Sequence, residues 1–196
     1  MADQLASDTE IEELVADLSR PDGGDVSAVE ELLTHYPDDP RLHFMLGSVL
    51  INGQSDYIKA HAALSRAIEL APEYALARYQ LGFFELTSGE ADRALATWGP
   101  LLNAPSDNYL RIFVEGMTHV IRDEFAEAIA KFERGIKLNT DNAPMNGDIQ
   151  LLMQELRSKM EGAASASHKD EPHKASAETS ATSLLLGQLG GEQTRH

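Results

Sequence analysis

Residues 75–105 read ALARYQLGFFELTSGEADRALATWGPLLNAP, and this stretch decides the fold. Its apolar residues follow a helical period on both sides of Gly89, which predicts two helices joined by a tight turn. Ala60, Ala94 and Ala128 lie 34 residues apart, as do Leu64, Trp98 and Phe132. Gly47, Gly82 and Gly116 follow at spacings of 35 and 34. Several columns that recur together predict a repeated two-helix unit.

This spacing, with Leu81-Gly82, Gly89, Ala94, Trp98 and Pro105, resembles the tetratricopeptide repeat family. The resemblance implies an all-α fold, a right-handed superhelix of antiparallel helix pairs. Small residues are expected where two helices approach most closely, and bulky ones fill the gaps between helices. A glycine inside a helix costs roughly 1 kcal/mol relative to alanine, so three in one column indicate a packing requirement.

The predicted domain covers residues 9–161. Three full repeats are expected at about 40–72, 75–105 and 109–140, after a degenerate N-terminal repeat over residues 9–37. Pro100 should kink or end the second helix of the middle repeat. A capping helix is expected at about 143–161, because one unit cannot cover its own apolar stripe. Residues 1–8 are predicted to be disordered, as is the tail 162–196, which carries an apolar patch at 184–189.

Charge narrows the possible partners. The formal net charge is −16, and residues 1–39 hold twelve acidic side chains against one basic, Arg20. Nucleic acid and anionic lipid are therefore unexpected partners. The charge either keeps the protein soluble or forms an acidic rim that attracts a basic partner. No apolar stretch approaches the roughly 20 residues of a membrane span, and the chain has no cysteine. A cytoplasmic location is the default expectation.

The family resemblance also implies a concave groove lined by the first helix of each repeat. Most of the residues at these positions are apolar or aromatic, which favours an apolar peptide or helix of a partner protein as ligand. The groove residues predicted here are Phe44, Met45, Ser48, Tyr79, Gln80, Phe83, Phe113, Val114, Met117 and Val120.

Other occupants of the groove remain open. It could be filled by a second copy of the chain, by the C-terminal helix or by the tail patch at 184–189. The tail patch can reach it because a flexible linker of about 22 residues spans some 25 Å. The chain could thus be an adaptor, a chaperone similar to those of type III secretion, or a structural subunit whose groove is permanently filled. The clamp with which some family members hold acidic C-termini is absent, because the matching positions supply no cationic donors.

The sequence offers no sign of catalysis. It shows no nucleophile paired with a base, no phosphate-binding loop and no metal-ligand spacing among its seven histidines. We therefore expect a non-catalytic protein without cofactor or metal. In the family that the repeats resemble, the columns of Glu85, Glu115 and His119 are usually apolar. Glu115 and His119, at i and i+4, are expected to pair, with a small polar pocket formed by all three as the alternative.

Overall fold

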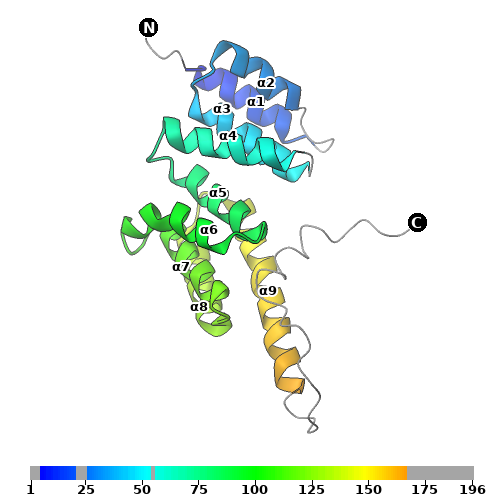
Figure 1. Ribbon diagram of the computed structural model, residues 1–196, viewed down its shortest axis with the longest axis vertical. Coiled ribbons are helices and arrows are strands. Elements are labelled where there is room, and N and C mark those ends of the chain that lie inside the picture. The colour runs from blue at the N-terminus through cyan, green and yellow to red at the C-terminus, as the bar shows by residue number, and fades with distance from the viewer. Residues whose placement is uncertain (1–4, 21–25, 54–55, 167–196) are drawn as a thin grey trace, which may run out of the picture. The chain divides into compact units, whose positions relative to one another are not determined.

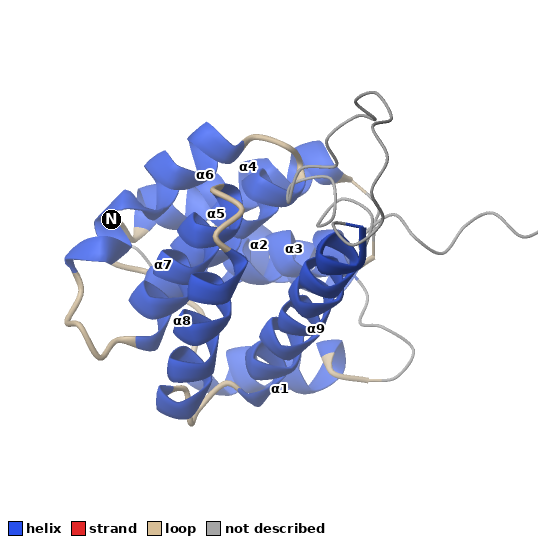
Figure 2. Cartoon of the chain, turned by 90° about the horizontal axis from the view of Figure 1, so that it is seen from below, coloured by secondary structure: helices blue, strands red, loops and turns tan. Residues whose placement is uncertain are grey.

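Every regular element in the described residues is a helix. The computed structural model describes residues 5–20, 26–53 and 56–166, with side chains to residue 162. Over these ranges it contains no strand, nine α-helices and one 3-10 helix (Figures 1 and 2). The helices are α1 (Asp8–Leu18), α2 (Val26–His35), α3 (Pro40–Asn52), α4 (Tyr57–Leu70), α5 (Ala75–Thr87), α6 (Ala91–Trp98), η1 (Gly99–Asn103), α7 (Tyr109–Ile121), α8 (Phe125–Leu138) and α9 (Ala143–Ala166). The all-α prediction is confirmed.

The chain divides into two units, and the boundary between Leu81 and Gly82 falls inside α5. The first unit holds α1 to α4 and the first half of α5. Its core combines side chains of α1, α2, α3 and α4, among them Leu14, Val29, Leu42 and Leu46. The second unit holds the rest of α5, α6, η1, α7, α8 and α9. The superhelical stacking of the repeats stays a prediction.

The glycine columns identified in the sequence mark the close contacts inside each helix pair. Side chains of the following helix occupy the space where a Cβ would lie: Leu64 faces Gly47, Trp98 faces Gly82, and Phe132 faces Gly116. A Cβ on any of these glycines would come within 3.0 Å of its neighbour. Leu64, Trp98 and Phe132 are fully buried. The recurrence at about 34 residues is thus a recurrence of one packing contact.

Turn geometry repeats with the same period. Gly89, between α5 and α6, has a φ of 85°, and Asp123, between α7 and α8, has a φ of 58°. These residues lie 34 positions apart. Aspartate visits the left-handed region more readily than most residues, so the second turn does not need a glycine. The expected effect of Pro100 is also confirmed, because α6 ends at Trp98 and continues as the 3-10 helix η1.

Both ends of the predicted domain differ from expectation. Residues 5–8, predicted to be disordered, are ordered: Ser7 caps α1 through a capping box with Glu10, and Ala6 is buried. The local sequence pattern did not reveal that Ala6 is held by Asp39, 33 residues further along the chain. At the other end, α9 continues to Ala166 rather than stopping at residue 161. Residues 1–4 and 167–196, with the apolar patch 184–189, lie outside the described residues.

Gly116 lies in a close contact and Gly147 lies in open space, so Gly→Ala substitutions at these two positions should have opposite effects on stability. Gly116→Ala places a methyl group against the ring of Phe132, and such overpacking costs about 1–3 kcal/mol. Gly147→Ala in α9 meets nothing within 4 Å, so it should gain up to about 1 kcal/mol of helix propensity. Urea unfolding of both variants measures the two changes. Equal effects at both positions would refute the packing role of the glycine column.

Candidate functional site

Four of the predicted groove residues are partly exposed and belong to the first unit. Phe44, Met45 and Ser48 lie on α3, and Gln80 lies in the first half of α5. All four are neither fully buried nor fully exposed. The ring of Phe44 lies 5.2 Å from that of Tyr74, centroid to centroid, at an interplanar angle of 50°. We call Phe44, Met45, Ser48 and Gln80 the α3 surface.

A polar contact joins the two helices of the α3 surface. The Ser48 hydroxyl lies 2.8 Å from the Phe44 carbonyl oxygen and 3.0 Å from Oε1 of Gln80. A hydroxyl carries a single proton, so it can donate to only one of these two oxygens at a time. The Gln80 amide therefore keeps hydrogen-bonding capacity of its own. An apolar side chain next to an amide group suits a peptide, whose backbone needs polar partners.

The remaining predicted groove residues, apart from Phe83, are buried, which corrects their assignment as exposed contact residues. Tyr79 is 5% exposed, Val120 1%, and Phe113, Val114 and Met117 are 0% exposed. Only Phe83 keeps partial exposure.

The position of Phe113 has a clear physical cause. Its ring fills the space beside Gly135 of α8 and lies 6.5 Å from the ring of Phe132. Gly135 lacks a side chain, and this lets the aromatic ring of α7 enter the α7–α8 contact. The sequence columns identify Gly116 as a small residue of the repeat but give no reason to expect Gly135 to act in the same way. Phe113 is therefore part of the packing within the third repeat.

The three polar residues in apolar columns do not form one pocket. Glu115 accepts hydrogen bonds from Arg111 at 2.9 Å and Lys131 at 2.6 Å. His119 lies 2.6 Å from Glu124, so the expected pair of Glu115 and His119 is wrong.

Glu85 is buried and accepts a hydrogen bond of 2.6 Å from Thr97, with Arg93 at 3.6 Å. Each of the three polar residues thus has its own partners.

Burial raises the pKa of Glu115, but hydrogen bonds from Lys131 and Arg111 outweigh this and lower it. Its carboxylate accordingly stays ionised, as a structural ion pair requires.

A second surface lies between α1 and α2, where the structure has a groove of about 400 Å³. Apolar atoms of Leu14, Ala28 and Leu32 line it, and acidic side chains of both helices surround them. The lining residues are Glu10, Glu13, Leu14, Asp17, Ala28, Glu31, Leu32, His35 and Tyr36. We call this the α1–α2 groove. The excess of acidic residues among the first 39 was the sequence signal for it, but the pattern alone did not show that four of them, Glu10, Glu13, Asp17 and Glu31, line a cavity.

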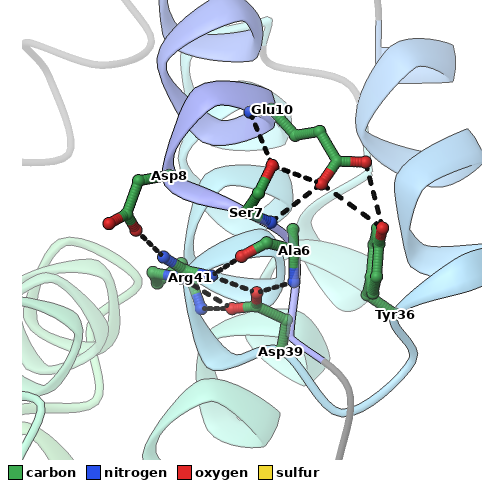
Figure 3. Close-up of polar contacts among 7 residues, drawn as sticks. All are labelled: Ala6, Ser7, Asp8, Glu10, Tyr36, Asp39 and Arg41. Atoms are coloured by element: carbon green, nitrogen blue, oxygen red, sulfur yellow. Dashed lines mark hydrogen bonds and ion pairs between the residues drawn. The ribbon is translucent and has the colours of Figure 1, made fainter.

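One wall of the α1–α2 groove is rigidly held. The Glu10 carboxylate accepts hydrogen bonds from the Ser7 hydroxyl at 2.7 Å and the Ser7 backbone N–H at 2.8 Å (Figure 3). The Tyr36 hydroxyl donates to the same carboxylate at 3.0 Å, which links α1 to the end of α2. These bonds from Ser7 and Tyr36 lower the pKa of Glu10 and keep it ionised. The same contact raises the pKa of Tyr36.

An ionic cluster holds the start of α1 against α3. Asp39 caps α3, is 0% exposed, and accepts a hydrogen bond of 3.0 Å from the Ala6 N–H. Arg41 pairs with Asp39 at 2.7 Å and with Asp8 at 3.0 Å, and it donates to the Ala6 carbonyl oxygen (Figure 3). Burial raises the pKa of Asp39, but the hydrogen bonds from Arg41 and Ala6 outweigh this and lower it. This cluster sets the position of α1 and hence of the α1–α2 groove.

Metal binding and membrane insertion find no support in the described part of the chain. No group of three or more histidine, aspartate or glutamate side chains there could hold a metal ion. None of the helices described has both the length and the apolar character needed to cross a bilayer.

Comparison with known proteins gives matches only among solved structures. No family model matches the chain, and no curated protein matches it. A MamA double mutant, titled "MamA RS-1 ArsTM double mutant", is 16% identical, with a TM-score of 0.47, over 70% of this chain and 85% of that one. MamA from residue 41 to its end, from Desulfovibrio magneticus RS-1, is also 16% identical with a TM-score of 0.47. That match covers 74% of this chain and 86% of the other.

The ionic cluster predicts that two neighbouring aspartates differ sharply in importance. Asp39→Asn leaves Arg41 without its buried partner and should lower the free energy of unfolding by about 3 kcal/mol. Asp38→Asn removes an ion pair with Arg66, and the Asp38 side chain is 50% exposed. This change should lower the free energy of unfolding by less than about 1 kcal/mol. Urea unfolding of both variants at neutral pH measures the difference. Similar losses would refute the anchoring role of Asp39.

The same cluster predicts how stability depends on pH. The pKa of Asp39 is lower in the folded protein than the usual value of 3.8. Its ionised form therefore stabilises the fold above that value, and this contribution is lost as the pH falls below it. The difference in unfolding free energy between the wild type and Asp39→Asn should accordingly shrink in acid. A difference that stays constant from neutral pH down to about pH 3 would contradict this assignment.

Proposed function

We propose that this chain is a non-catalytic protein-interaction module. It binds a peptide or helix of a partner protein, and an apolar side chain of that ligand packs on the α3 surface. The partial exposure of Phe44, Met45, Ser48 and Gln80 carries this proposal. A repeated helix pair is a scaffold whose exposed helix faces serve as binding surfaces in many repeat proteins. As an adaptor or chaperone-like protein it would need no cofactor.

The chemistry of the α3 surface suits a mixed ligand. Phe44 and Met45 offer an aromatic and a polarizable apolar contact, and methionine adapts readily to differently shaped ligands. Ser48 and Gln80 can satisfy the backbone groups of the ligand, which would otherwise lose hydrogen bonds on binding. This composition favours a short apolar segment over a charged one. The secretion-chaperone and filled-homodimer alternatives remain predictions, because no described contact favours either of them.

A peptide selection followed by two alanine variants tests the proposal. Peptides selected from a random display library against the full chain should carry an apolar anchor residue. Phe44→Ala should weaken their binding about tenfold or more, because interface aromatic residues commonly contribute more than 1 kcal/mol. Fluorescence anisotropy with a labelled selected peptide measures the affinity.

The matched control is Ile58→Ala. Ile58 on α4 is also apolar and is 86% exposed, but it is not part of the α3 surface. Its replacement should leave the affinity within about twofold of the wild type, well below the effect expected at a contact residue. Selected peptides that bind Phe44→Ala as tightly as the wild type would refute the α3 surface as the binding site. So would a loss at Ile58 equal to that at Phe44.

A further inference from the structure

We propose that the α1–α2 groove is a second protein-binding site, which takes a basic segment of a partner protein. An arginine or lysine side chain of that segment would lay its methylene stem on the apolar floor, with its charged end among the surrounding carboxylates. This site is separate from the α3 surface, so it stands whether or not the proposed function of that surface holds.

The floor of the groove accounts for the aliphatic part of such a ligand. Leu14, Ala28 and Leu32 belong to α1 and α2 and contribute to the core of the first unit. A surface cavity of about 400 Å³ has room for a long side chain and its flanking backbone. Arginine and lysine commonly bury their methylene stems against apolar surface and keep the charged end near water. The small side chain of Ala28 leaves space in this floor.

The rim of the groove accounts for the charged part. Glu10 is held in place by Ser7 and Tyr36, and Asp17 pairs with Arg20 at 2.8 Å. Glu13 and Glu31, one on each helix, have no hydrogen-bond or ion-pair partner for their carboxylates among the described side chains. Their charges are thus available to an external cation, and hydrogen bonds between arginine and carboxylate are among the stronger ones in proteins.

The chain's own charge distribution favours a basic protein segment over other ligands. Arg20 is the only arginine or lysine among the first 39 residues, and it already pairs with Asp17. The described side chains around the groove do not form a metal-binding group. Twelve acidic residues in this region would repel nucleic acid and anionic lipid and would increase the association rate of a cationic peptide. The proposed occupant is therefore an arginine or lysine side chain of a partner protein.

A designed peptide pair tests this site on the full chain. The probe is the capped hexapeptide Arg-Leu-Arg-Arg-Leu-Arg, and the control replaces every arginine by citrulline, which has nearly the same shape but no charge. The arginine peptide should shift the backbone amide resonances of α1 and α2 around the groove, and the citrulline peptide should bind at least about tenfold more weakly. The affinity of the arginine peptide should fall as salt rises from 50 to 300 mM, because salt screens exposed charges.

Two charge-matched double variants separate the groove from general acidity. Glu13→Gln with Glu31→Gln should weaken binding of the arginine peptide about tenfold or more, because hydrogen bonds between charged groups are among the stronger ones. Glu73→Gln with Glu127→Gln changes the net charge equally at exposed positions outside the groove. That pair should change the affinity by less than about threefold, as expected for screened, distant charges. Equal losses in both pairs would overturn the proposal, and so would absence of binding.

A third variant tests the floor without changing charge. Ala28→Met fills the groove and should weaken binding of the arginine peptide. Circular dichroism should show that the helix content is unchanged. Phe44→Ala, which alters the α3 surface, should leave binding of the arginine peptide unchanged. If the resonance shifts map to the α3 surface instead, or Phe44→Ala abolishes binding, the arginine peptide uses the α3 surface and the groove proposal is wrong.

Discussion

The close approach of two helices at a single glycine is the constraint on which each repeat depends. Gly47, Gly82 and Gly116 each leave the space that a bulky side chain of the next helix fills. A fully buried side chain such as Trp98 contributes roughly 1.5–3 kcal/mol through removal of apolar surface from water. The glycine alone is unfavourable in a helix by about 1 kcal/mol. The contact is therefore stabilising only as a pair, and this explains why both members recur together along the chain.

The same logic of paired groups governs the polar part of the structure. Asp39 is fully buried, yet it caps α3, binds the Ala6 N–H and pairs with Arg41. A buried carboxylate is tolerated only when such partners compensate its lost hydration. Because one of these partners, Ala6, lies 33 residues away in the chain, the residue that caps α3 also holds the start of α1. The α1–α2 groove thus depends on a cap that belongs to a different helix.

The sequence predicted the repeated contacts well because they involve fixed spacings and extreme residue types. A helical glycine and a tryptophan in register leave few alternatives. It predicted the exposed residues less well, because exposure depends on what covers a helix. Phe113 shows the difference: its column suggested a binding surface, but Gly135 allows its ring to pack against α8. The N-terminal segment was missed for a similar reason. Its order comes from a long-range hydrogen bond that the Ala6 N–H donates to Asp39, which no local pattern reveals.

The polarity of the groove residues on each helix offers a physical criterion that separates exposed from buried groove positions. One column carries Ser48, then Phe83, then Met117, and its neighbour carries Met45, Gln80 and Val114. Ser48 and Gln80 bond to each other and remain partly exposed, whereas Met117 and Val114 are fully buried. A polar side chain needs water or a partner and so resists complete burial, while an apolar one gains from it. A helix whose groove positions are all apolar, such as α7 with Phe113, Val114, Met117 and Val120, is therefore better interpreted as core, and a helix pair that contributes Ser48 and Gln80 as surface. By this criterion the α3 surface, and not α7, is the part of the predicted groove that stays partly exposed.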